Sequence, residues 1–127
     1  MTSGPYPSDN VLEIVPVGAE AAYFRTQLEF ANGHECNFSG VADLSGSSLV
    51  YRDPEQQCEL HLDVTSGKIA FDDKGGHCRE QSCGARGGYS GVTFDLKARR
   101  PIGYMQKLLT SQEYLDAVKA YRAGHPE

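Results

Sequence analysis

The sequence predicts a mainly β protein: a single-domain antiparallel β-barrel or sandwich of about seven strands, followed by a C-terminal helical segment. Three observations lead to this fold class. A chain of 127 residues has the usual size of one domain. Its 14 glycines exceed the average share of about 7%, which indicates many tight turns. Short apolar segments alternate with turn residues from Val11 onward, and after Arg100 the apolar spacing becomes helical.

These changes in pattern divide the chain into three parts. We expect residues 1–10 to form a flexible N-terminal segment, because they are rich in Ser, Gly and Pro. Residues 11–100 are expected to form the antiparallel β domain, and residues 101–124 to form helices that pack on it.

The clearest strand covers residues 22–30, where Phe24 and Leu28 alternate with polar side chains. Asn32-Gly33 follows it and predicts a hairpin, so the next strand should run back antiparallel. In that strand Gly40 would allow a close approach or a small bulge. Pro16 fits an edge strand or a bulge. The expected strands are 11–17, 22–30, 34–44, 47–53, 58–64, 68–73 and 91–96.

Two helices are expected near the C-terminus. Pro101 fits the first turn of a short helix that continues over residues 102–109. Thr110 and Glu113 have the spacing of a capping box and predict the start of a second helix, which Gly124 would stop. The apolar side chains of this segment should cover an opening or an edge of the sheet.

The net charge of -5 is unevenly distributed. Residues 1–60 carry nine acidic and two basic side chains, whereas residues 61–127 carry eight acidic and ten basic ones. An acidic surface argues against nucleic acid as a partner, since phosphate binding needs Lys and Arg. It favours a basic partner, although it is also compatible with a role in solubility alone. No apolar run approaches the ~20 residues of a transmembrane helix, so no transmembrane segment is expected.

The four cysteines, Cys36, Cys58, Cys78 and Cys83, allow three interpretations. A disulfide interpretation pairs Cys36 with Cys58 and Cys78 with Cys83, which is one of three possible connectivities. A zinc interpretation adds nearby histidines, but Cys58 and His61 would point to opposite faces of one strand. Four free thiols are the third alternative.

The disulfide interpretation also sets the expected location. Disulfides persist in oxidising compartments, so we expect a periplasmic or secreted protein. The first ten residues contain no basic region followed by an apolar one, so the protein is either cytosolic or has lost its signal peptide. The disulfide interpretation favours a signal peptide that has been removed.

The sequence contains no pattern that predicts catalysis. The motifs of serine hydrolases, HExxH metalloproteases and phosphate-binding loops are missing from it. Asp72 and Asp73 are adjacent acids, but the spaced oxygen ligands of a calcium loop do not accompany them, so we expect solvated turn residues. No cofactor or metal is expected. An enzyme would remain an alternative if His34, His61 and Asp63 converged in one cleft.

Four segments have a distinctive arrangement of Cys, Gly and aromatic residues: NGHECNFSGVA, YRDPEQQCELHL, DDKGGHC and CGARGGYSGVTF. In this arrangement, residues 11–96 resemble a domain found in small exported bacterial proteins, some of them grouped with LprI-type lysozyme inhibitors. The resemblance implies a disulfide-bonded β domain in the cell envelope that protects peptidoglycan from lytic enzymes.

A second likeness concerns residues 45–51, SGSSLVY. Their S-G-x-x-x-x-Y spacing is similar to that of a loop which periplasmic inhibitors of c-type lysozyme insert into the enzyme's cleft. Val50 departs from the likeness, because those inhibitors often carry a basic residue near the tyrosine. The ionic contact would then come from elsewhere, such as Arg52. The alternative is a plain Ser-Gly hairpin turn.

We therefore expect a binding protein of the cell envelope, not an enzyme, which inhibits or neutralises a peptidoglycan-degrading enzyme as a lysozyme inhibitor or an immunity protein. The alternative is a small-ligand-binding or structural envelope module, and a cavity lined by Tyr23, Tyr51 or Tyr89 would favour it. The candidate loops are 45–48 and 84–90. The expected partner-binding residues are Ser45, Ser47, Ser48, Tyr51, Arg52, Arg86, Tyr89 and Ser90.

Overall fold

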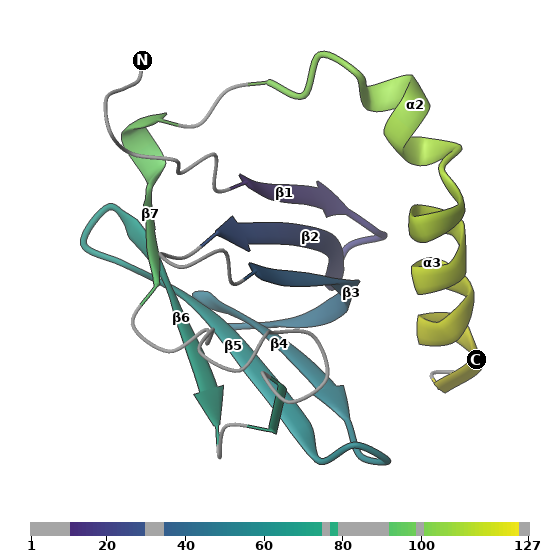
Figure 1. The fold of residues 1–127 in the computed structure, drawn as a ribbon, viewed down its shortest axis with the longest axis horizontal. Helices are drawn as coiled ribbons and strands as arrows, with labels where there is room; N and C mark the ends of the chain where they lie inside the picture. The colour runs from purple at the N-terminus through teal and green to yellow at the C-terminus, as the bar shows by residue number, and fades with distance from the viewer. Residues whose placement is uncertain (1–10, 30–34, 75–76, 79–91, 99–100, 125–127) are drawn as a thin grey trace.

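A computed structural model of the chain describes residues 11–29, 35–74, 77–78, 92–98 and 101–124. In these ranges the chain forms strands that are followed by a 3-10 turn and two α-helices (Figure 1). The elements are β1 (Val11–Pro16), β2 (Ala21–Glu29), β3 (Glu35–Ser45), β4 (Ser48–Asp53), β5 (Cys58–Thr65), β6 (Lys68–Lys74), β7 (Thr93–Asp95), η2 (Leu96–Ala98), α2 (Met105–Leu109) and α3 (Gln112–Gly124).

The strands form one antiparallel meander, in which each strand pairs with the strand before it. In Figure 1, β1 to β3 run across the view, whereas β5 to β7 run steeply down it, because the sheet is strongly twisted. The described strands thus make a nearly closed, barrel-like sheet with a C-terminal helix, and the predicted fold class is confirmed.

The main core lies on the inner face of this curled sheet. Alternate residues of each strand point inward, as the period of two requires. Phe24 is fully buried there, and its ring packs on Phe38 and Tyr51. Thr26 is also fully buried, and its hydroxyl donates a 3.0 Å hydrogen bond to the carbonyl of Val11. The other fully or almost fully buried core residues are Leu28, Cys36, Ala42, Cys58, Leu60, Leu62, Phe71 and Cys78.

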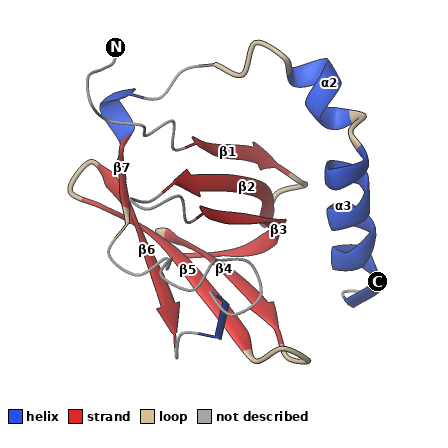
Figure 2. Ribbon diagram, in the orientation of Figure 1, coloured by secondary structure: helices blue, strands red, loops and turns tan. Residues whose placement is uncertain are grey.

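A second apolar cluster lies on the outer face of β1 to β3, beneath the helices. Val15, Tyr23 and Val41 point outward from the three strands and are buried against Leu108 and Val118. Figure 2 shows both C-terminal helices on the same side of the strands. The helices therefore cover an outer face of the sheet and not an opening, and β2 is buried on both faces.

The strands themselves follow the sequence closely. Pro16 ends β1, which pairs only with β2 among the described strands, so it occupies the predicted edge position. Residues 32–33 lie outside the described residues, but β2 and β3 are antiparallel, as the expected hairpin requires. The close approach predicted at Gly40 is also present, because the Tyr51 ring lies against its backbone.

The predicted helix starts are wrong. The first helix begins at Met105, after a turn, and not within one turn of Pro101. The second helix begins after Ser111, whose Oγ accepts a 3.2 Å hydrogen bond from the backbone N–H of Tyr114. Thr110 instead ends α2, and its hydroxyl donates to the carbonyl of Gln106. Thr110 and Ser111 both have a hydroxyl group that can cap a helix N-terminus. Thr110 is still part of the end of α2, so Ser111 caps α3.

The predicted cysteine pairing is also wrong. Cys58 forms a disulfide with Cys78, and their Cα atoms lie 4.6 Å apart. Cys36 is disulfide-bonded as well, but not to Cys58. The physical reason is the strand order: β4 lies between the strands of Cys36 and Cys58, and strands two positions apart are separated by about 10 Å, beyond the reach of a disulfide.

Asp73 differs from its expected place in a solvated turn. It lies within β6 and is 6% exposed. Its carboxylate accepts a 3.1 Å hydrogen bond from the backbone N–H of Cys78. The acid therefore helps to hold the end of the disulfide against the sheet.

Candidate functional site

The β3–β4 turn, here called the hairpin tip (residues 45–48), is the first predicted site. Hydrogen bonds from two sides fix it. The backbone N–H of Val64 donates to the carbonyl of Ser47 at 2.9 Å, and the N–H of Leu44 donates to the carbonyl of Glu20 at 2.8 Å. The tip is thus a hairpin turn, as the alternative interpretation had it, and it is anchored to β5 and to the β1–β2 connection.

Side chains around the hairpin tip combine polar and apolar groups. Ser48 Oγ donates a 2.5 Å hydrogen bond to Asp63 Oδ1 on the neighbouring strand. Leu44 and Val64 have the inward alternation of their strands, but they lie where the sheet ends and are 54% and 41% exposed. Two large exposed apolar side chains, one on β3 and one on β5, therefore flank the hydroxyl groups of the hairpin tip.

The other predicted partner-binding residues do not gather at the tip. The Tyr51 ring points inward, and its centroid lies 5.1 Å from that of Phe38. Burial, with the charge of Asp53, raises the pKa of Tyr51. Arg52 points outward to Glu59, with 3.5 Å between Nε and the nearest carboxylate oxygen. Arg86, Tyr89 and Ser90, like the rest of the candidate loop 84–90, lie outside the described residues.

The outer face of β4 to β6 carries paired charges of both signs. His61 Nε2 lies 2.6 Å from a carboxylate oxygen of Glu59, and this hydrogen bond, more than any other cause, lowers the pKa of Glu59. The ring's Nδ1 lies 4.0 Å from Asp63. Lys74 pairs with Asp72 at 2.7 Å. This face is therefore not a uniformly acidic surface.

This charged face also bears on the enzyme and metal alternatives. His61 and Asp63 come together on the sheet, whereas His34 lies outside the described residues. In the part of the chain that the structure describes, no group of three His, Cys, Asp or Glu side chains is arranged to hold a metal ion. The predicted opposite orientation of Cys58 and His61 is confirmed, because Cys58 is buried in the core and His61 lies on the outer face.

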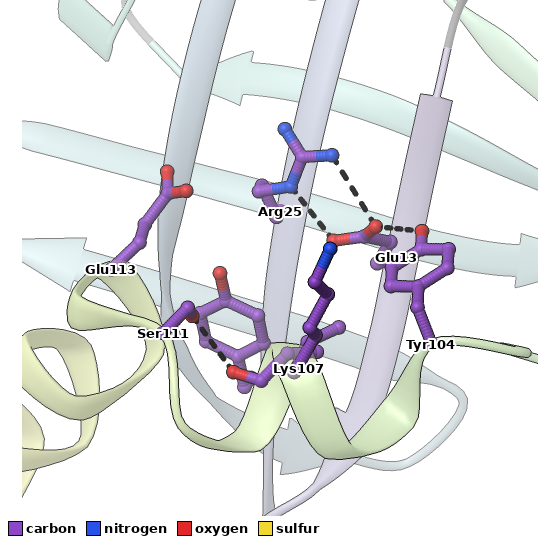
Figure 3. A pocket seen from close by; sticks show the side chains of 8 residues that line it. Glu13, Arg25, Tyr104, Lys107, Ser111 and Glu113 are labelled. Atoms are coloured by element: carbon purple, nitrogen blue, oxygen red, sulfur yellow. Dashed lines mark hydrogen bonds and ion pairs between the residues drawn. The ribbon is translucent and has the colours of Figure 1, made fainter.

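A second candidate site is a pocket of about 280 Å³ between the outer face of β1 and β2 and the junction of α2 with α3 (Figure 3). The sheet supplies its floor, and the helices supply its rim. The side chains that line it are Glu13, Tyr23, Arg25, Tyr104, Lys107, Leu108, Ser111 and Glu113.

The floor of the pocket is a partly buried ion pair. Glu13 is 4% exposed, and its carboxylate accepts hydrogen bonds from Arg25 Nε at 2.7 Å and from Nη2 at 3.3 Å. The Tyr104 hydroxyl donates a further hydrogen bond to the same carboxylate. Burial alone would raise the pKa of Glu13, but these hydrogen bonds and the Arg25 charge outweigh it and hold the pKa below 4.5. Glu13 is therefore a carboxylate at neutral pH.

Tyr23 forms one wall of the pocket. Its ring meets that of Tyr114 edge to face, with 5.0 Å between the centroids. Burial, followed by the negative charges of Glu113 and Glu13, raises the pKa of Tyr23 to about 12. Tyr23 is one of the three tyrosines expected at a ligand cavity. Tyr51 lies in the core instead, and Tyr89 is outside the described residues.

Sequence reasoning did not identify the charged residues of this pocket. The available signal was the pair of opposite charges on successive strands, Glu13 between two apolar residues and Arg25 directly after Phe24. Their contact depends on the register, in which the two residues lie directly opposite. Lys107 and Glu113 reach the pocket only through helix docking.

None of the described helices combines the length and the apolar character needed to cross a lipid bilayer. The hairpin tip and the pocket each combine polar and apolar groups on the described surface. Comparisons with family models, with curated proteins and with solved structures find no match for this chain, so the chemistry of these two sites is what bears on its function.

Proposed function

We propose that this domain is a binding protein of the cell envelope that inhibits a peptidoglycan-degrading enzyme, and that the hairpin tip makes the contact. The observation that carries the proposal is the exposure of Leu44 and Val64 beside an anchored turn. Large apolar side chains of this kind gain free energy when a partner's cleft removes them from water.

The charge around the tip suits a basic partner. Asp43 lies two residues before the turn, and Asp63 lies on β5 opposite Ser48. Exposed Glu20 is joined to β3 through its carbonyl. Carboxylates at the rim of an interface mainly speed the encounter with a partner of opposite charge. A basic hydrolase that acts on the anionic cell wall is such a partner.

The stiffness of the tip favours inhibition by insertion. The turn is held by backbone hydrogen bonds to Glu20 and Val64, and the Cys58–Cys78 disulfide fixes the beginning of β5. A loop that is already ordered loses little conformational entropy on binding. The disulfide also favours an oxidising compartment, so we place the protein in the periplasm or outside the cell.

The test is inhibition of peptidoglycan lysis by a panel of c-type lysozymes, g-type lysozymes and amidases, followed by turbidity. We expect Leu44→Asp and Val64→Asp each to weaken inhibition at least about tenfold, as expected for residues at the centre of an interface. Leu115→Asp is the matched control, because Leu115 is an apolar side chain of similar exposure, 48%, that lies on α3 and not on the strands next to the tip. It should inhibit like the wild type.

Thermal unfolding of the three variants separates a folding defect from a binding defect. The proposal is wrong if the wild-type protein binds none of the enzymes. It is also wrong if a folded Leu44→Asp variant inhibits as strongly as the Leu115→Asp control.

A further inference from the structure

Two charged side chains stand unpaired at the rim of the pocket. In the described part of the chain, neither the Lys107 ammonium nor the Glu113 carboxylate takes part in an ion pair or a side-chain hydrogen bond. Both nevertheless line the same pocket. Figure 3 shows Glu113 at one side of it and Lys107 at the other, nearer the Glu13 carboxylate.

The floor beneath them is already neutralised. The Glu13 charge is matched by Arg25, and a third hydrogen bond comes from Tyr104. A ligand therefore does not meet a single net charge at the bottom of the pocket. At the rim it meets the Lys107 ammonium and the Glu113 carboxylate, and the negative charge of Glu113 also acts on Arg25.

The walls between the two rim charges are largely apolar. Leu108 is 6% exposed and Tyr23 is 1% exposed, so each presents only a small, fixed surface to the pocket. Ser111 contributes no free donor, because its hydroxyl donates to the Leu108 carbonyl at 2.7 Å. The volume of about 280 Å³ lies just below the range of roughly 300–1,000 Å³ that drug-sized ligands occupy. The occupant should be a small molecule.

These features select the charge pattern of the ligand. A simple anion would pair with Lys107 but would approach Glu113, and a simple cation would face the reverse conflict. A charge that loses water without gaining a partner is strongly disfavoured. A molecule with one carboxylate and one ammonium group satisfies both rim charges at once.

We propose that this pocket binds a small zwitterion, either a free α-amino acid or a short peptide with free ends. Lys107 pairs with the ligand carboxylate, and Glu113 pairs with its ammonium group. An apolar ligand side chain lies against Leu108 and Tyr23. This site is separate from the hairpin tip and does not depend on the proposed inhibition.

The experiment is calorimetric titration of the full chain with L-leucine and with the dipeptide glycyl-L-leucine, each also in an N-acetylated and a C-amidated form. We expect one of the two zwitterions to bind, and either blocked form of it to bind at least about tenfold more weakly, a loss of 1.4 kcal/mol or more. If L-leucine binds more tightly, the ligand is a free amino acid; if glycyl-L-leucine binds more tightly, it is a short peptide.

Charge-removing variants then assign the two contacts. Lys107→Met should weaken zwitterion binding at least about tenfold but leave binding of the amidated form unchanged, since that form has no carboxylate. Glu113→Gln should show the reciprocal pattern with the acetylated form. Lys119→Met, an exposed change on α3 outside the pocket, is the matched control.

Three results would overturn the proposal. One is the absence of binding by both zwitterions up to about 10 mM, which corresponds to less than about 3 kcal/mol of affinity. Another is equal binding of the free and blocked forms. The third is unchanged zwitterion binding in both pocket variants while their thermal unfolding matches that of the control.

Discussion

The ring of Tyr51 lies directly against the backbone of Gly40, so that a Cβ atom on residue 40 would be only 2.6 Å from Cε1 of the ring. The ring is also surrounded by Phe24 and Phe38, with centroid distances of 5.8 Å and 5.1 Å. It therefore has little room to move away. The glycine is required by packing, since residue 40 lies in a regular strand and has no positive φ.

Gly40→Ala should accordingly destabilise the protein by about 1–3 kcal/mol, the usual cost of overpacking a core. Urea denaturation measures this loss. Gly124→Ala is the control, because an added Cβ there meets no atom within 4 Å, and its stability should be equal or slightly higher. In the Tyr51→Leu background the penalty of Gly40→Ala should shrink. Equal penalties in the two backgrounds would contradict the contact.

Removal of the Cys58–Cys78 disulfide should cost about 3 kcal/mol, because the bond closes a loop with a sequence separation of 20. The suitable variant is the double change Cys58→Ala and Cys78→Ala, since both side chains are buried and serine would bury a hydroxyl. Urea denaturation checks the loss. Digestion of the unreduced wild-type protein should release the Cys58 and Cys78 peptides joined together. A joined Cys36–Cys58 peptide would refute the connectivity.

Glu13→Gln should reduce stability at neutral pH by about 1–3 kcal/mol, because Arg25 loses its charged partner in a partly buried place. The pKa of Glu13 is lower in the folded protein than its ordinary 4.5. Its contribution is therefore present above about pH 4.5 and is lost as the pH falls through the folded pKa. Denaturation at several pH values should show the wild type and the variant converging in acid. A gap that persists or widens in acid would contradict the assignment.

Tyr121→Phe should loosen α3 from the sheet. The Tyr121 hydroxyl donates a 2.6 Å hydrogen bond to Asp43 on β3, and this bond, more than burial, raises the pKa of Tyr121 to about 12. Because the folded pKa is the higher one, the contribution is complete below pH 10 and disappears as the pH rises toward about 12.

The expected loss for Tyr121→Phe at neutral pH is about 0.5–1.5 kcal/mol, near the lower end because the pair is partly exposed. Hydrogen exchange of the α3 amides should also be faster. Asp43→Asn keeps an acceptor but removes the charge, so the pKa of Tyr121 should fall back toward 10 in a spectrophotometric titration. Unchanged exchange in Tyr121→Phe would show that apolar contacts alone hold the helix.

The strands could be predicted from the sequence because their signals are local. Alternation of apolar and polar residues and the turn residues between them act over fewer than about ten positions. Residues 22–28 illustrate this, because their alternation predicts the strand correctly. The same alternation suggests that Tyr23 and Arg25 face solvent, whereas in the structure they lie beneath the helices. A period of two shows which residues share a face, but not what covers that face.

The disulfide and the pocket could not be predicted in this way, because both depend on which elements become neighbours. The burial of Cys58 followed from its strand register, but its partner followed from the order of the strands. In the same way, Glu13 meets Tyr104 across 91 positions of the chain. Such contacts form only when a helix docks, and no short segment contains their signal.

The order of the strands in the meander affects how this protein folds during synthesis. Every strand pairs with one made just before it, so the curled sheet can form in step with synthesis or export. The outer cluster cannot, because Val15, Tyr23 and Val41 are buried by Leu108 and Val118, which are synthesised after all the strands. Until α3 has been synthesised and has docked, the nascent domain exposes the apolar outer face of β1 to β3. This exposed apolar surface is the kind that a chaperone binds.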